Sequence, residues 1–95
     1  QNIFSDENFH NLVLRTIEDI HNKTKNLNWF DIRNGLKKNT EDGEVIEILD
    51  GYNNKGGKLK SIHYTHPTYT EPYKITESYF QNKLTAYRKL FLNKK

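Results

Sequence analysis

Histidine pairs are the first residues in this sequence whose type suggests metal chemistry. His63 and His66 frame the run HYTH, and imidazole nitrogen is a common zinc ligand. Residues three apart on a strand point to opposite faces, so these rings meet on one ion only if the strand ends between them. His10 and His21 lie near one side of a predicted helix but about 16 Å apart along it. With no cysteine in the chain, we predict no metal site and no cofactor.

Neighbouring carboxylates are the next candidates, because a pair of them can act as general acid and base. Glu41 with Asp42 and Glu44 with Glu47 are such pairs, yet both lie in turn or strand surroundings with many polar neighbours. The run NNKGGK at 53–58 lacks the spacing of a phosphate-binding loop and the Ser or Thr after its lysine. The sequence also lacks a nucleophile elbow. We therefore expect no enzymatic activity.

Length and composition limit the protein to one domain, 1–95, with one modest core. The chain has 95 residues, of which 34% are hydrophobic, and its six Tyr, five Phe and one Trp supply much of the apolar area. Few aliphatic residues beside many rings favour a sheet-rich core. No apolar run approaches the roughly 20 residues that span a bilayer.

The charge balance is mildly basic, with 15 Lys and Arg against 12 Asp and Glu. Nucleic-acid-binding domains usually carry a denser basic stripe that is rich in arginine, whereas this chain has only Arg15, Arg33 and Arg88. Nucleic-acid binding is therefore the alternative hypothesis, in which a C-terminal helix carries Arg88, Lys89 and the last two lysines.

The chain begins at Gln1 and contains no methionine. We expect a processed or trimmed product, for which a removed signal peptide and a cloning boundary are the two explanations. The first of these predicts an exported protein, found in the periplasm, in the cell envelope or secreted.

The clearest predicted element is a helix over residues 5–26. Ser5 can cap it, and the acidic side chains of Asp6 and Glu7 suit the positive end of its dipole. Apolar residues then recur at spacings of three and four, at Phe9, Leu12, Val13, Ile17 and Ile20. This stripe predicts an amphipathic helix that packs against the rest of the domain.

The middle of the chain is typical of strands and turns. Trp29–Arg33 is interpreted as a short extended segment, and EVIEILDGY at 44–52 is β-branched and apolar enough for a strand. NNKGG at 53–57 is a predicted loop, and KLKSIHYT at 58–65 returns as the partner strand. HPTYTEP at 66–72 carries both prolines and is a predicted loop.

The stretch YFQNKLTAYRKLFL at 79–92 is compatible with two structures. As a helix it places Phe80, Leu84, Tyr87 and Phe91 on one side, but Lys83 falls on that side too. As a hairpin it turns at 81–83, where asparagine tolerates positive φ, and pairs the segment ending at Phe80 with the one that follows. Propensity leaves both structures open.

A resemblance favours the hairpin. Gly43-Glu44, the run Gly57-Lys58-Leu59-Lys60-Ser61-Ile62 and the run Tyr79-Phe80-Gln81-Asn82-Lys83-Leu84 resemble motifs of small exported proteins of unknown function with a PepSY-like β-meander. The resemblance covers roughly residues 40–92, and the sequence departs from it where no glycine follows Asn82. It implies an α+β fold in which an N-terminal helix packs on a four-stranded, possibly five-stranded, antiparallel meander sheet.

Aromatic residues form the predicted binding surface. One helix covers only one face of such a sheet, so rings on the other face either pack in a second small core or contact a partner. Phe80, Tyr87 and Phe91 are expected to line that face, and Tyr64, Tyr69 and Tyr73 to surround the 66–72 loop. We expect an exported or envelope-associated module that binds another protein through the open sheet face or the 66–72 loop. A purely structural subunit, which would form a stable homo-oligomer in solution, is the third hypothesis.

Overall fold

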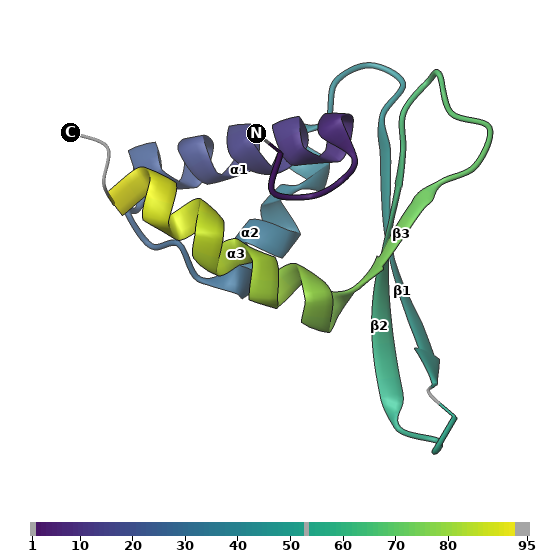
Figure 1. Ribbon diagram of the computed structural model, residues 1–95. Coiled ribbons are helices and arrows are strands. Elements are labelled where there is room, and N and C mark those ends of the chain that lie inside the picture. The colour runs from purple at the N-terminus through teal and green to yellow at the C-terminus, as the bar shows by residue number, and fades with distance from the viewer. Residues whose placement is uncertain (1, 53, 93–95) are drawn as a thin grey trace.

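The computed structural model describes residues 2–52 and 54–92 and shows an α+β domain with its helices on one face of a sheet (Figure 1). The helices are α1 (Glu7–Lys23), α2 (Trp29–Gly35) and α3 (Glu77–Leu92), with a 3-10 turn, η1, at Lys37–Asn39. The strands are β1 (Val45–Tyr52), β2 (Lys58–Thr65) and β3 (Tyr73–Thr76). In the described part of the chain, no helix is long and apolar enough to cross a bilayer.

The sheet is an antiparallel meander in the order β1-β2-β3. Ile48 pairs with Ile62, and Ile62 pairs in turn with Ile75, so one row of aliphatic side chains crosses all three strands. The predicted strands at 44–52 and 58–65 are confirmed, and so is the predicted loop at 66–72 between β2 and β3. The β1–β2 hairpin extends beyond the helical layer (Figure 1).

Helix α1 is confirmed, although its cap is Asp6 and not Ser5. The Asp6 carboxylate accepts a hydrogen bond from the Phe9 backbone N–H at 2.9 Å, which satisfies one of the free donors of the first turn. The buried side of the helix follows the predicted stripe through Phe9, Leu12, Val13 and Ile17.

The extended segment predicted at 29–33 is wrong, because these residues begin α2. Asn28 caps this helix by accepting from the Asp31 backbone N–H at 2.8 Å, and only Ile32 within it is fully buried. An Asn followed three residues later by an acidic side chain is a helix-start signal, which the prediction passed over.

The hairpin predicted for the C-terminal stretch is also wrong, and its second strand is part of α3. The Thr76 hydroxyl accepts from the Tyr79 backbone N–H at 3.0 Å at the helix start. Phe80, Leu84 and Tyr87 then follow at helical spacing and are all fully buried. In the described residues the sheet therefore has three strands and not the four that were predicted.

Lys83 falls on the apolar side of this helix, and the structure shows how its side chain is accommodated. Its side chain is half-buried, and its ammonium nitrogen lies 5.3 Å from the centre of the Tyr79 ring. The aliphatic stem of a lysine can cover apolar surface while its charged end stays accessible to water. One lysine beside an apolar stripe is therefore compatible with a buried helix face.

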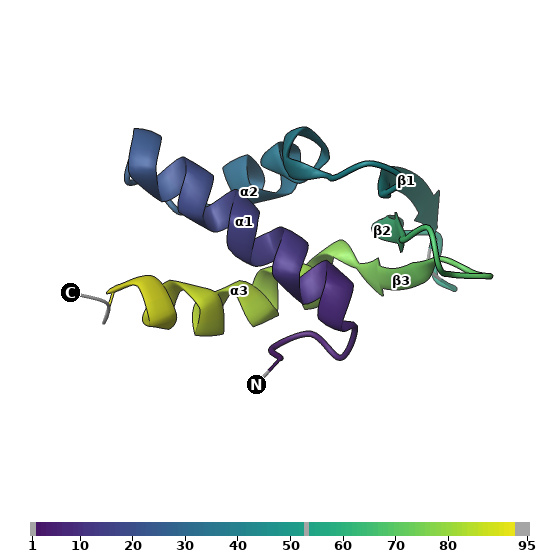
Figure 2. The ribbon, with the colours of Figure 1, turned by 90° about the horizontal axis from the view of Figure 1, so that it is seen from above.

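The core lies between the sheet and the crossing helices α1 and α3 (Figure 2). Phe4, in the segment before α1, inserts here with its ring centre 4.9 Å from that of Phe9 and 6.0 Å from that of Phe80. Offset and edge-on contacts of this kind stabilise aromatic cores beyond the area that they bury. The first residues of the chain thus help to hold α1 against α3.

Gly43 explains one motif of the resemblance in physical terms. Its φ of +86° suits glycine, and a Cβ at this position would lie 2.4 Å from the Pro67 ring. The turn that it makes sets Glu44 at the start of β1. The motif therefore reports local turn geometry, while the third motif of the resemblance lies in α3.

Candidate functional site

Three of the six aromatic residues predicted to contact a partner are core residues. Tyr64, Phe80 and Tyr87 are fully buried, so a partner cannot contact them in this fold. The prediction placed Phe80 and Tyr87 on an open sheet face because it assumed strands there. Helix α3 instead turns both toward α1, and β2 directs Tyr64 to the same core.

The other three, Tyr69, Tyr73 and Phe91, are partly buried and pack against the core. Phe91 belongs to the last turn of α3, and its ring centre lies 5.8 Å from that of His21 on α1. The structure therefore does not gather the six residues on one surface. It divides them between the core, the 66–72 loop, the start of β3 and the end of α3.

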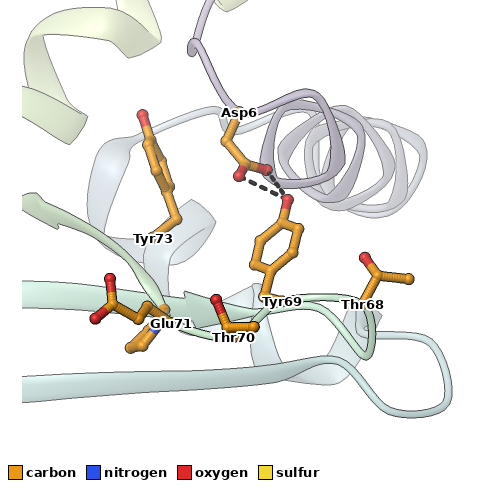
Figure 3. Close-up of a pocket in the computed structure, with 7 residues that line it drawn as sticks. Asp6, Thr68, Tyr69, Thr70, Glu71 and Tyr73 are labelled. Carbon is orange, nitrogen blue, oxygen red and sulfur yellow. Dashed lines mark hydrogen bonds between the residues drawn. The ribbon is translucent and has the colours of Figure 1, made fainter.

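Tyr69 ties the 66–72 loop to the beginning of α1 (Figure 3). Its hydroxyl donates to the Asp6 carboxylate, 2.6 Å from both oxygens, and accepts from the Asn8 amide at 3.2 Å. Burial raises the pKa of Tyr69, and the bond to Asp6 raises it further. The tyrosine therefore acts as a tether between loop and helix.

A hollow of about 460 Å³ opens beside this tether and is lined by Asp6 and residues 68–73. Figure 3 shows Tyr69 directed at Asp6 while Tyr73 projects separately toward the helices. The Thr68 hydroxyl is 2.8 Å from the His66 ring, and the Tyr73 hydroxyl is 3.5 Å from that of Ser5. Because Asp6 and Tyr69 bond each other, and Thr68 and Tyr73 bond neighbouring side chains, the hollow is better explained as a junction than as a ligand site.

A buried polar chain, which sequence reasoning missed, joins β2, the start of β1 and α1. The Tyr64 hydroxyl donates to Glu44, whose side chain is only 3% exposed, and Arg15 donates to the other carboxylate oxygen at 2.8 Å. Burial and then the bond to Glu44 raise the pKa of Tyr64. Glu44 therefore has a structural role, and Glu47, the other half of that predicted acid–base pair, lies on the opposite sheet face.

His10 holds the segment before α1. Its Nδ1 accepts from the Ile3 backbone N–H at 3.2 Å and lies 2.7 Å from the Tyr87 hydroxyl, which can donate to the same nitrogen. An Nδ1 that accepts carries no proton, so this geometry requires a neutral ring. Burial lowers the pKa of His10 in agreement with that requirement.

The histidines do not assemble a metal centre. His63 lies within β2, whereas His66 follows that strand and bonds Thr68. Within residues 2–52 and 54–92, no three side chains of the ligating types come together as a metal site would require.

All three arginines make bonds within the fold. Arg15 bonds Glu44, Arg33 forms an ion pair with Glu77 at 2.6 Å, and Arg88 donates to the Leu27 carbonyl at 2.7 Å. A guanidinium engaged in this way has fewer donors for a phosphate or a base edge. The arginine that the nucleic-acid hypothesis placed on a recognition helix instead joins α3 to the segment after α1.

The uncovered face of the sheet is the surface that remains. The helices lie on the other side (Figure 1), and alternate residues of the strands point away from them. On β1 these include Val45 and Leu49, which are 48% and 40% exposed. Across the middle of the face runs a row of charged or titratable residues in register, Glu47, His63 and Lys74.

The uncovered face ends at β1, and a second hollow of about 440 Å³ lies at this edge of the sheet. It is lined by residues 46–49 of β1 and by Arg33 and Asn34 of α2 with Lys37 of η1. Sequence reasoning missed it because α2 was taken for an extended segment. We take the uncovered face and this edge together as the candidate site.

Comparison of the chain with protein-family models, curated proteins and solved structures returns no match. Evidence for a function therefore comes from the residues and geometry of the chain itself. The PepSY-like resemblance stays a prediction.

Proposed function

We propose that this domain is a binding module that holds another protein on the uncovered side of its sheet and performs no catalysis. The observation that carries the proposal is the uncovered face itself, where the β1 side chains Val45 and Leu49 are 48% and 40% exposed on either side of Glu47. Exposed apolar residues set among polar ones are typical of protein contact surfaces. An exported or envelope-associated location forms part of the proposal.

The covered side supports the same assignment by elimination. Tyr64, Glu44, His10 and Arg33 are the residues that would most suggest chemistry, and each is occupied by a bond inside the fold. The uncovered face has the opposite character, because within the described residues the Glu47 and Lys74 side chains make no ion pair. Charged side chains that no ion pair engages are available to bind another molecule.

The test compares two substitutions of exposed leucines. Leu49→Asp places a charge on the uncovered face, and Leu90→Asp makes the same change on α3, where the leucine is 53% exposed. Immobilised wild type and both variants are exposed to an envelope extract, after circular dichroism shows that each is folded. We expect Leu49→Asp alone to lose the proteins that wild type retains. Equal retention by all three would contradict the proposal.

Nucleic-acid binding is tested in the same preparation. A basic module would bind duplex or single strands at low salt and lose them as salt rises, because counterion release drives such binding. Salt-sensitive binding that survives Leu49→Asp would favour this alternative over protein binding.

A further inference from the structure

The sheet has two edges, and they differ in how well they are protected. The β3 edge is four residues long, follows Pro72 and carries Lys74. Short strands, proline and lysine are the devices by which proteins stop other chains from pairing with an edge. The β1 edge is eight residues long, contains no proline and has no strand beyond it among the described residues. The β1 edge therefore lacks these protective features and can pair with a strand of another chain.

A strand added beside β1 would find a place for its side chains. Every second side chain of an added strand points to one face of the sheet, here toward the hollow between β1, α2 and η1. Of the four β1 residues that line this hollow, Ile46 and Ile48 belong to the helix-facing side of the strand and Glu47 and Leu49 to the uncovered side, while Asn34 and Lys37 line it from α2 and η1. The half-buried Ile48 is the isoleucine that an apolar side chain of the added strand would contact, because Ile46 is only 6% exposed.

The charges at this edge restrict what the added strand carries. Arg33 is neutralised by Glu77, whereas the Lys37 side chain is exposed and makes no ion pair within the described residues. On the uncovered face Glu47 is likewise exposed and without an ion pair there. A complementary strand therefore has a carboxylate on its helix-side positions and a cation on the other face.

A second copy of this chain fits these requirements less well. The only charged residues of β1 are Glu47 and Asp50, so a β1–β1 pairing brings no cation to Glu47. Asp50 is also already paired with Lys60 at 2.8 Å. Charge complementarity thus favours a different protein.

From these observations we propose that the partner binds by adding an extended strand along β1, with an apolar side chain and a carboxylate facing the hollow and a lysine or arginine facing Glu47. This inference rests on the proposed function, because it specifies how the uncovered side engages a protein. The ladder of backbone hydrogen bonds supplies affinity, and the alternating side chains supply specificity.

The test starts from a displayed library of random nine-residue peptides selected on the immobilised protein. We expect enriched peptides to alternate apolar and polar residues and to place an acidic and a basic residue at neighbouring positions. A synthetic copy of one enriched peptide should slow amide hydrogen exchange across Val45–Tyr52. N-methylation of its alternate backbone amides should weaken binding by at least about tenfold, because ladder bonds are lost.

Exchanging the charges of Lys37 and of the peptide's acidic residue then tests whether the peptide carboxylate lies beside Lys37. Lys37→Glu should weaken binding of that peptide roughly fivefold, and replacing the peptide's acidic residue with lysine should restore it. Lys89→Glu, an exposed lysine on α3, is the matched control and should leave binding unchanged.

Three outcomes would overturn the inference: no enrichment, enriched peptides that leave β1 exchange unchanged, or a dimer of the chain alone in which β1 is already protected. The proposed function fails separately. If Leu49→Asp loses proteins from the extract while no peptide protects β1, the module binds through its face and not its edge. If neither assay responds, both proposals are wrong.

Discussion

The two faces of the sheet are built from the same strands and have opposite characters. Toward the helices β2 directs Ile62 and Tyr64, which are fully buried, and away from them it directs His63, which is half-buried. On β1 the neighbours Ile46 and Glu47 differ in the same way. The inner residues are determined by what they pack against, whereas outer residues such as Val45, Glu47 and Leu49 stay exposed in the fold. That difference makes the outer face the place to look for function.

The two faces should differ most in how much the free energy of unfolding falls when an aliphatic side chain is shortened to alanine. Ile62→Ala removes a fully buried side chain and leaves a cavity, so we expect the free energy of unfolding to fall by about 2–5 kcal/mol. Leu49→Ala, on the uncovered face, should cost less than about 1 kcal/mol. Urea denaturation followed by circular dichroism measures both, and equal losses would mean that the outer face is covered in solution.

The next largest effect concerns the tyrosine hydroxyls. Tyr64→Phe leaves the buried Glu44 carboxylate without one of its donors, so we expect a loss of about 1–3 kcal/mol in unfolding free energy. Tyr73→Phe removes a hydroxyl whose contact with Ser5 is 3.5 Å long and exposed, and should change stability little. If the two variants are equally stable, the polar chain through Glu44 does not stabilise the core.

A smaller effect should follow pH through His10. Because its pKa is lowered in the folded protein, the unfolded chain takes up the proton first as pH falls below about 6.5. Stability is therefore complete above that pH and declines below it, although the nearby Glu7 carboxylate opposes the shift.

His10→Asn provides the control, because its amide oxygen can accept from Ile3 and Tyr87 without titrating. Thermal unfolding of both proteins between pH 7.5 and 5 should show a steeper decline for wild type. Parallel declines would place the dependence on other groups.

The smallest expected effect on stability is the most informative about function. Glu47→Lys, on the uncovered face, should change the free energy of unfolding by no more than about 0.5 kcal/mol. The same variant should lose a peptide that presents a cation to this position. Fluorescence anisotropy with the selected peptide measures binding. Unchanged affinity would mean that Glu47 does not contact the peptide.

Several elements of the fold were predictable because their signals are local. The stripe from Phe9 to Ile17 has helical spacing, and the two strands of the hairpin are β-branched segments on either side of a Gly/Asn loop. The turn at Gly43 also follows from its neighbourhood. Such elements need little information from distant parts of the chain.

The candidate site was only partly predictable. An uncovered sheet face was expected, but Phe80, Tyr87 and Phe91 were assigned to it from a hairpin that does not form. Asn34 and Lys37 became site residues only because 29–35 is a helix, and the signal for that helix was Asn28 with Asp31. Which face stays open depends on where every helix packs.

By itself the sequence determined the α+β class, α1, β1 and β2, because periodicity and turn chemistry act over a few residues. Only the tertiary structure decided the final segment, which satisfies both a helical and a strand pattern. There Phe4 packs on Phe80, and Arg88 donates to the carbonyl of Leu27, 61 residues away in sequence. Contacts at such separations are invisible to local pattern, yet they decided that Phe80 and Tyr87 would form the core and leave the outer sheet face open.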